Sequence, residues 1–176
     1  MITPGHIQLM AQYNRWQNGS IYTAADTLTE AQRQESRGAF WGSIHLTLTH
    51  ILWADQNWMG RFTGKTPPWF PDASQPWPKS PKESVGYRLS WDELKRQRVA
   101  FDEVISDWAS TVEPSWLEGR LSYVHASGRH FDEPFWKHVT HMFNHQTHHR
   151  GQVHCMLTQY GAKPEDTDIP WMPDTA

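Results

Sequence analysis

Apolar side chains recur at helical spacing through the first 64 residues of the chain. From Pro4 to Thr27 they lie three, four or seven positions apart, which places them on one face of a helix. Thr3 followed by Pro4 is typical of a helix start, so we expect a first helix from about Pro4 to Thr27. A second helix is expected from a Ser43 cap to about Gly64. Its apolar positions are Ile44, Leu48, Ile51, Leu52, Met59 and Phe62.

Two further helices are expected in the second half of the chain. The sequence Ser90-Trp91-Asp92-Glu93 has the S-x-x-E form of a capping box and opens a third helix, which reaches about Ser110. A last helix begins near Pro134 and ends at Gly161, which has the position of a C′ glycine. Gly151 lies inside this helix and costs about 1 kcal/mol relative to alanine. We expect close packing against a neighbouring helix to compensate for it.

Two segments interrupt the helical pattern. Residues 66–84 contain six of the twelve prolines and cannot form a regular helix or a central strand. This loop is either a lid or interface element or a solvated excursion. Residues 114–133 alternate partly and include a Ser-Gly turn, which predicts a short β-hairpin. The sequence therefore predicts one all-α domain over residues 1–176, an up-down-type four-helix bundle with a long proline-rich loop and a short hairpin before the last helix.

Composition excludes several classes of partner and site. Sixteen Lys plus Arg against nineteen Asp plus Glu give a net charge of -3, so the chain has no basic footprint for nucleic acid or for a membrane surface. The single cysteine, Cys155, excludes an internal disulfide framework and a thiolate-rich zinc site, and we expect it to be an inert buried thiol. The start of the sequence lacks the features of a secretory signal, and no stretch approaches the about 20 apolar residues of a membrane helix. We expect a soluble cytoplasmic protein.

The histidines are more informative, because seven of the eleven fall between His130 and His154. His145 and His149 are four residues apart on the last predicted helix, so they project from one face. Such a pair can share a metal ion, and imidazole suits zinc, nickel, copper or iron. Two histidines make a weak site, so a third ligand has to come from elsewhere.

His50 is the best third ligand, because it lies on the apolar face of the second predicted helix, where an unpaired histidine is costly. Three histidines with the remaining coordination open describe a catalytic type of site rather than a closed structural one. His138 lies seven residues before His145 and either lines the same cavity or packs in the core. Trp16 and Trp53 are also candidate cavity walls, although core packing is the commoner role of tryptophan.

The remaining histidines fit ordinary positions. His45 lies about 140° around its helix from His50, and we expect it at the surface. His141 and His148 are rotated to one side of the pair, and His154 points away from it. We interpret each of these as a surface or core histidine.

Three segments together resemble a known family. They are Tyr13-Asn14-Arg15-Trp16 with Asn18, Leu48-Thr49-His50-Ile51-Leu52-Trp53-Ala54-Asp55, and Asn144-His145-Gln146-Thr147-His148-His149-Arg150-Gly151-Gln152. They resemble the DinB/YfiT-like superfamily, and the resemblance extends from end to end of the chain. The H-x-x-x-H-R-G-Q segment is its most specific part. The resemblance implies a four-helix bundle, often a homodimer, in which His50, His145 and His149 bind one divalent transition metal. Zinc or nickel is the first expectation, with iron or manganese as alternatives.

The resemblance implies two chemistries on a small-molecule substrate. One is a transferase or isomerase that uses a low-molecular-weight thiol, and the other is a hydrolase. Residues 146–148 are Gln, Thr and His, so the glutamate base of H-E-x-x-H proteases is absent and peptide hydrolysis by that route is disfavoured. The sequence offers no candidate general acid or base. Asp55 points about 140° from His50, and we expect Arg150 to bridge helices.

Two interpretations without turnover stay open at this point. The protein could be a metal-holding stress-response module, or a purely structural bundle whose histidines are accidental. Metal content separates the structural interpretation from the others, and turnover separates the enzyme from the module.

Overall fold

Four long helices carry the fold of this computed structural model, which describes residues 1–72, 74–125 and 127–174. They are α1 (Pro4–Asp26), α3 (Ile44–Thr63), α5 (Trp91–Thr111) and α7 (Phe135–Gln159). Each lies within about two residues of the helix predicted for it, so the all-α bundle is confirmed. None of the helices in the described ranges is long and apolar enough to cross a membrane.

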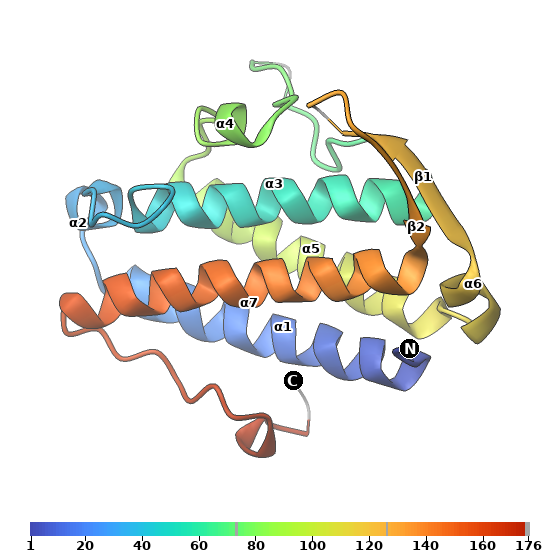
Figure 1. The fold of residues 1–176 in the computed structure, drawn as a ribbon. Helices are drawn as coiled ribbons and strands as arrows, with labels where there is room; N and C mark the ends of the chain where they lie inside the picture. Colours follow the sequence, from blue (N-terminus) through green and yellow to red (C-terminus); the bar gives the residue numbers. More distant parts are fainter. Residues whose placement is uncertain (73, 126, 175–176) are drawn as a thin grey trace.

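The order of the helices around the bundle differs from their order in the chain. α1 packs against α5 and α7, and α3 packs against the same two helices, so α1 and α3 lie on one diagonal (Figure 1). α3 and α5 run in the same direction. The chain therefore has to return along the bundle between them, which gives the proline-rich residues 66–84 a structural reason for their length.

Hydroxyl side chains fix the starts of three long helices. Thr3, Ser43 and Ser90 each accept a hydrogen bond from the backbone N–H three residues further on. The capping box predicted at Ser90 is only half formed, because the Glu93 carboxylate binds the Arg96 guanidinium at 2.6 Å. The caps set the phase of each helix, and hence which side chains face the centre of the bundle.

Short helices complete the connections, and the sequence pattern did not predict them. They are α2 (Glu30–Gln34), α4 (Pro81–Ser84), α6 (Pro114–Glu118) and the 3₁₀ turn η1 (Ile169–Trp171). Each of the last three has a proline in its first turn, a position where proline stabilises a helix start. Such elements are too short for hydrophobic periodicity to show.

The predicted hairpin is confirmed. β1 (Arg120–Val124) pairs antiparallel with β2 (His130–Pro134), with Arg120 opposite Pro134 and Val124 opposite His130. α7 begins directly after β2. The hairpin is therefore rigidly joined to the helix that carries the histidine pair, and Figure 1 shows it standing across the end of α3 and α7.

Two side chains have environments opposite to those that the sequence predicted. His45 is buried at 6% exposure rather than at the surface, and its Nε2 lies 3.1 Å from the carbonyl oxygen of Leu89. Leu89 lies at the end of the connection between α3 and α5. This connection returns along α3 and covers the side of the helix that carries His45. Cys155 is exposed rather than buried, because it points away from the bundle on the outer face of α7.

Gly151 also differs from expectation. A Cβ atom at this position would have no neighbour within 4 Å, so the expected close packing against another helix is wrong. Gly151→Ala should therefore raise the free energy of unfolding by about 0.5–1 kcal/mol, because alanine loses less backbone entropy in a helix. Urea denaturation of the metal-free protein measures the change.

Gly60 of α3 is the matched control for this substitution. A Cβ atom there would lie 2.7 Å from the carbonyl oxygen of Lys65, so Gly60→Ala should destabilise the fold. A loss of stability in Gly151→Ala would mean that the outer face of α7 is covered in solution.

A chain of buried polar side chains crosses the centre of the bundle and joins all four long helices. Arg98 of α5 forms ion pairs with Asp55 of α3 at 2.6 Å and with Asp102 at 2.9 Å. Asn14 of α1 donates to the Asp102 carboxylate at 3.1 Å and accepts from Arg150 of α7. All five side chains are at most 5% exposed. Two cations and two carboxylates balance, so this buried polar chain of side chains carries no net charge.

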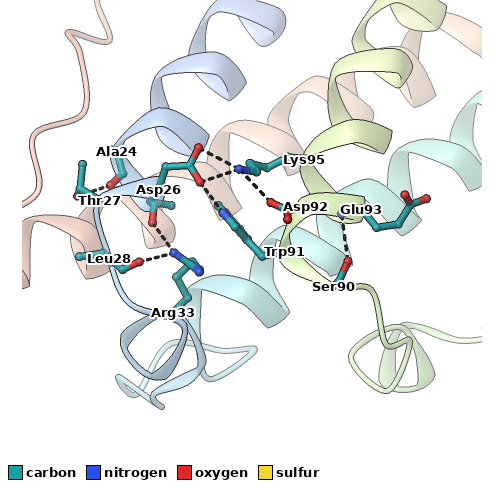
Figure 2. A network of polar contacts seen from close by, with 11 residues as sticks. Ala24, Asp26, Thr27, Leu28, Arg33, Ser90, Trp91, Asp92, Glu93 and Lys95 are labelled. Atoms are coloured by element: carbon teal, nitrogen blue, oxygen red, sulfur yellow. Dashed lines mark hydrogen bonds and ion pairs between the residues drawn. The ribbon is translucent and has the colours of Figure 1, made fainter.

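A second polar network ties the end of α1 to the start of α5 near the surface (Figure 2). The Asp26 carboxylate accepts hydrogen bonds from Trp91 Nε1 at 2.6 Å and from Lys95 Nζ at 2.9 Å. Partial burial raises the pKa of Asp26, but the hydrogen bonds from Lys95 and Trp91 outweigh it and hold this pKa below its ordinary value. The charged form of Asp26 therefore stabilises the folded state.

The stabilisation by Asp26 should depend on pH. A carboxylate with a lowered pKa contributes above its unfolded-state pKa of about 4 and loses that contribution as the pH falls through its folded-state pKa. Asp26→Asn should lower the free energy of unfolding at pH 7 by no more than about 1 kcal/mol, because Asp26 is half exposed, and by much less at pH 3. Urea denaturation at both pH values measures this. Asp92→Asn is the control, since Asp92 contacts Lys95 from a 93% exposed position.

Candidate metal centre

Three imidazole rings meet between α3 and α7. His50 lies on α3, and His145 and His149 lie one turn apart on α7. One nitrogen of each ring lies within 4.8 Å of the others, and His50 Nε2 is 3.1 Å from His145 Nε2. The structure thus brings together the three histidines that the sequence selected.

The positions of these histidines follow from helix packing. α3 and α7 are direct neighbours, and Figure 1 shows them running in opposite directions. His50 is buried on the side of α3 that faces α7, where its Nε2 meets His145. On α7, Arg150 is held in the bundle centre by Asn14, which fixes the rotation of the helix around His149. The triad is therefore part of the packed bundle and does not depend on a free loop.

Ser84 determines which nitrogen of His50 carries the proton. The Ser84 hydroxyl donates to the carbonyl oxygen of Pro81 at 2.6 Å, so its only hydrogen is already engaged. Its oxygen lies 3.0 Å from His50 Nδ1 and must accept a hydrogen bond from it. The Nε2 lone pair of His50 is then free and directed at His145. Sequence reasoning missed Ser84, which comes from the proline-rich connection.

Gln152 acts in the same way on His149. The Gln152 amide oxygen lies 2.8 Å from His149 Nδ1, and an amide oxygen can only accept. His149 therefore also keeps its Nε2 lone pair free. His145 differs, because its Nδ1 is buried without a hydrogen-bond partner in the described part of the chain. Its Nε2 faces that of His50, and two such lone pairs need a proton or a cation between them.

The rings are neutral at physiological pH. Burial, together with the neighbouring His145 and His149, lowers the pKa of His50 to about 3. Burial likewise lowers the pKa of His145 to about 3, with His149 as the next cause. Neutral imidazole is the form that binds metal ions. Two nitrogens at 2.0–2.1 Å from a tetrahedral zinc ion lie about 3.3 Å apart, close to the spacing of His50 and His145. The donor set fits a divalent transition metal.

Trp41 covers the triad, and sequence reasoning missed it. Its ring centroid lies 4.1 Å from that of His50 and 6.4 Å from that of His149. Trp41 belongs to the connection between α2 and α3, where no periodic pattern assigns it to a face. Its position keeps water from reaching His50 on that side.

A cavity of about 310 Å³ opens beside His50 and His145. Trp53, one of the predicted walls, lines it, and its Nε1 donates to the carbonyl oxygen of Pro78 at 2.9 Å. His141 also lines it, although its angle from the histidine pair predicted an ordinary surface or core position. The volume is that of a small-molecule site.

The other two predicted wall residues lie elsewhere. His138 is buried behind the cavity, where its ring stacks on Trp58 at 5.4 Å. Trp16 of α1 lines a separate hollow between α1 and α5, and its Nε1 donates to Glu165 at 2.6 Å. Both have a packing role in this structure.

The cavity beside the triad has an unusual charge pattern. Within residues 1–72, 74–125 and 127–174 no carboxylate lines it. Asp55 and Arg150 point into the polar chain at the bundle centre. The sequence predicted that both lie outside the site, because their side chains point away from the directions of His50 and His149. The structure thus adds no carboxylate that could act there as a general base.

Comparisons with known proteins agree with this architecture. The sequence model of the DinB family matches residues 1–176. The crystal structure of a DinB-like protein from Bacillus cereus ATCC 10987 superposes with a TM-score of 0.53 and 21% sequence identity, over 86% of this chain and 90% of that one. At this identity the similarity shows the shared fold alone. Comparison with curated proteins gave no significant match.

Proposed function

We propose that this chain, which belongs to the DinB family, binds one divalent transition-metal ion between α3 and α7. His50, His145 and His149 would hold the ion through their Nε2 atoms. The observation that carries the proposal is the triad itself: three neutral imidazoles converge, and Ser84 and Gln152 engage the outer nitrogens of two of them.

The donor set bears on the identity of the metal. Imidazole nitrogens favour zinc or nickel, with iron or manganese as alternatives, whereas calcium and magnesium prefer oxygen ligands. Such an ion supplies Lewis acidity to a molecule held in the adjoining cavity. The chain's own contribution is to orient the imidazoles, to exclude water with Trp41 and to shape the cavity.

We further propose that the protein is a transferase or isomerase that uses a low-molecular-weight thiol. A thiol ionises near pH 8.5, so it needs little help from a base to become a nucleophile near neutral pH. Water needs more, and no carboxylate of the described residues lines the cavity to act as its base. A small-molecule hydrolase and a non-catalytic metal-binding module are the alternatives. A homodimer is proposed from the family resemblance, and a cytoplasmic location from the single cysteine, which suits a reducing compartment.

The proposed function is tested in two steps. Elemental analysis of protein purified without a histidine tag should find about one metal ion per chain. Turnover is then measured with thiols plus electrophiles, and with ester and lactone panels, before and after removal of the metal. Metal-dependent thiol transfer supports the enzyme, whereas a fully metallated protein without turnover favours the binding module. Absence of metal would contradict the site.

Ser84→Ala should lower metal affinity by about 10–100-fold while the fold stays intact, because the hydrogen bond that orients His50 is lost. Competition titration against a chromophoric chelator measures the affinity. Ser74→Ala is the control, since Ser74 lies in the same connection and bonds Asp72. Equal affinity in the Ser84 variant and the wild type would show that His50 is oriented without this hydroxyl.

A further inference from the structure

One stripe of side chains on α3 extends the triad into the cavity. It begins at His50 and ends at Arg61, and every member lies three or four residues from another, so all point to one side of the helix. The stripe consists of His50, Trp53, Ala54, Asn57, Trp58 and Arg61. The same wall of the cavity therefore carries a metal-binding group at one end and a guanidinium at the other.

Arg61 has no ionic partner in the part of the chain that the structure describes. Its guanidinium lies instead over two aromatic rings, 4.7 Å from the centroid of Trp58 and 4.6 Å from that of Tyr123. These contacts fix the plane of the guanidinium but leave its N–H donors free. Burial lowers the pKa of Arg61, yet the group stays charged at neutral pH. A half-buried cation without a counter-ion is costly, so a ligand that supplies the charge is favoured there.

The two segments outside the bundle close the cavity around Arg61. Tyr123 and Val124 of β1 form one side, and Lys79 and Pro81 of the proline-rich connection form another. Lys79 adds a second cation in a cavity without a lining carboxylate among the described residues. The charged side chains of the lining are therefore cations, which favours an anion, while the Glu83 carboxylate binds the Lys79 backbone N–H at 3.0 Å outside the lining.

We propose that the cavity binds a small elongated carboxylate, with the carboxylate on Arg61 and the far end of the molecule at the histidine triad. This inference rests on the proposed function, because it names the substrate class of the same site. The guanidinium forms paired hydrogen bonds that match a carboxylate. Trp53 offers an aromatic wall for an apolar or aromatic body, whereas Trp58 already carries Arg61 and stacks on His138.

Helix geometry sets the length of the ligand. His50 and Arg61 are eleven residues apart, which is about 16 Å along the axis of α3. Helical side chains lean toward the N-terminus, and the long Arg61 side chain thus reaches back toward the triad. A chain of several bonds between the carboxylate and the reacting end spans the remaining gap. A cavity of about 310 Å³ admits a molecule of this size.

Calorimetric titration of the metal-free protein tests the Arg61 end without the metal. The probes are 4-phenylbutyrate and its neutral amide, 4-phenylbutanamide. The wild type should bind the carboxylate about tenfold or more tightly than the amide, as expected of a charged hydrogen bond. Arg61→Gln should remove this preference, and Arg61→Lys should keep part of it. Lys65→Gln is the control, because Lys65 lies over Trp69 and outside the cavity; its preference should equal that of the wild type.

Three results would overturn the proposal: equal binding of acid and amide by the wild type, a preference that survives in Arg61→Gln, or tighter binding of inorganic phosphate than of phenylbutyrate. Retained preference in Arg61→Lys keeps the test valid if the glutamine variant fails to fold. Because the protein is metal-free, failure here leaves the metal proposal intact. Failure of the metal proposal likewise appears in elemental analysis and leaves this titration unaffected.

Discussion

His145→Ala is expected to lower metal affinity by at least about a hundredfold, because it removes one of the three proposed metal ligands. The three rings form a triangle, with the centroid of His145 5.1 Å from that of His50 and 4.5 Å from that of His149, and those of His50 and His149 5.0 Å apart. Its removal leaves two imidazoles on different helices. Competition with a chromophoric chelator measures affinity on tag-free protein, since a histidine tag binds the same metals.

The fold of the His145 variant should be unaffected in the metal-free state. The substitution removes the contact of His145 Nε2 with His50 Nε2 at 3.1 Å, but His145 Nδ1 has no hydrogen-bond partner among the described residues, so no other hydrogen bond of the ring is lost. The melting temperature of the metal-free variant should therefore be close to that of the wild type, whereas the rise on adding metal should be lost. His141→Ala is the control, because His141 lies one turn earlier on α7 and lines the same cavity. Equal loss of metal in both variants would contradict the assignment of His145.

The sequence was sufficient for the triad because each part of it is encoded locally. The spacing of His145 and His149 fixes their common face, and the apolar residues on either side of His50 indicate that this part of its helix is buried. Ser84 and Trp41 are equally close to His50, yet they reach it from irregular connections. No period assigns such residues to a face, so only the tertiary structure shows their role.

The bundle itself was predicted, but the order of its helices was not. Periodicity tells which side of a helix is buried and not which helix covers it. The parallel course of α3 and α5 explains the long proline-rich connection, which the sequence left open as a lid, interface element or solvated excursion. Trp69 of this connection is tied to α3, because its backbone N–H donates to Gln56 at 2.9 Å. The connection is thus part of the packed structure, and it supplies one wall of the cavity.

The segments that carry the family resemblance divide into two roles. His50, His145 and His149 form the triad, while Asn14, Asp55 and Arg150 belong to the polar chain through the bundle centre. Asp55 follows His50 on α3 and Arg150 follows His149 on α7, while Asn14 contacts Arg150 from α1. We infer that the polar chain holds the two helices in the rotation that the triad requires. Asp55 and Arg150 therefore act on the site by position and not by contact with a substrate.

Arg98→Met should have the largest effect on stability, a loss of about 3–5 kcal/mol in the free energy of unfolding. Arg98 is 2% exposed and pairs with Asp55 and Asp102, which are 0% and 5% exposed. Burial lowers the pKa of Arg98, but the two carboxylates outweigh it and keep the guanidinium charged. Methionine is similar in volume, so packing changes little. The cost arises because two buried carboxylates lose their cation.

Urea denaturation of the metal-free protein measures this loss, and two variants make it interpretable. Arg96→Met removes an exposed guanidinium two residues earlier in α5, whose ion pair with Glu93 lies at the surface, and should change stability by less than about 1 kcal/mol. Adding Asp55→Asn and Asp102→Asn to Arg98→Met should recover much of the loss, because the amides carry no charge. If the triple variant were less stable than Arg98→Met alone, the hydrogen bonds of the carboxylates, and not their unpaired charge, would be what Arg98 protects. In that case Asn14 and Asn18, which both donate to Asp102, would hold α1 in place without help from the ion pairs.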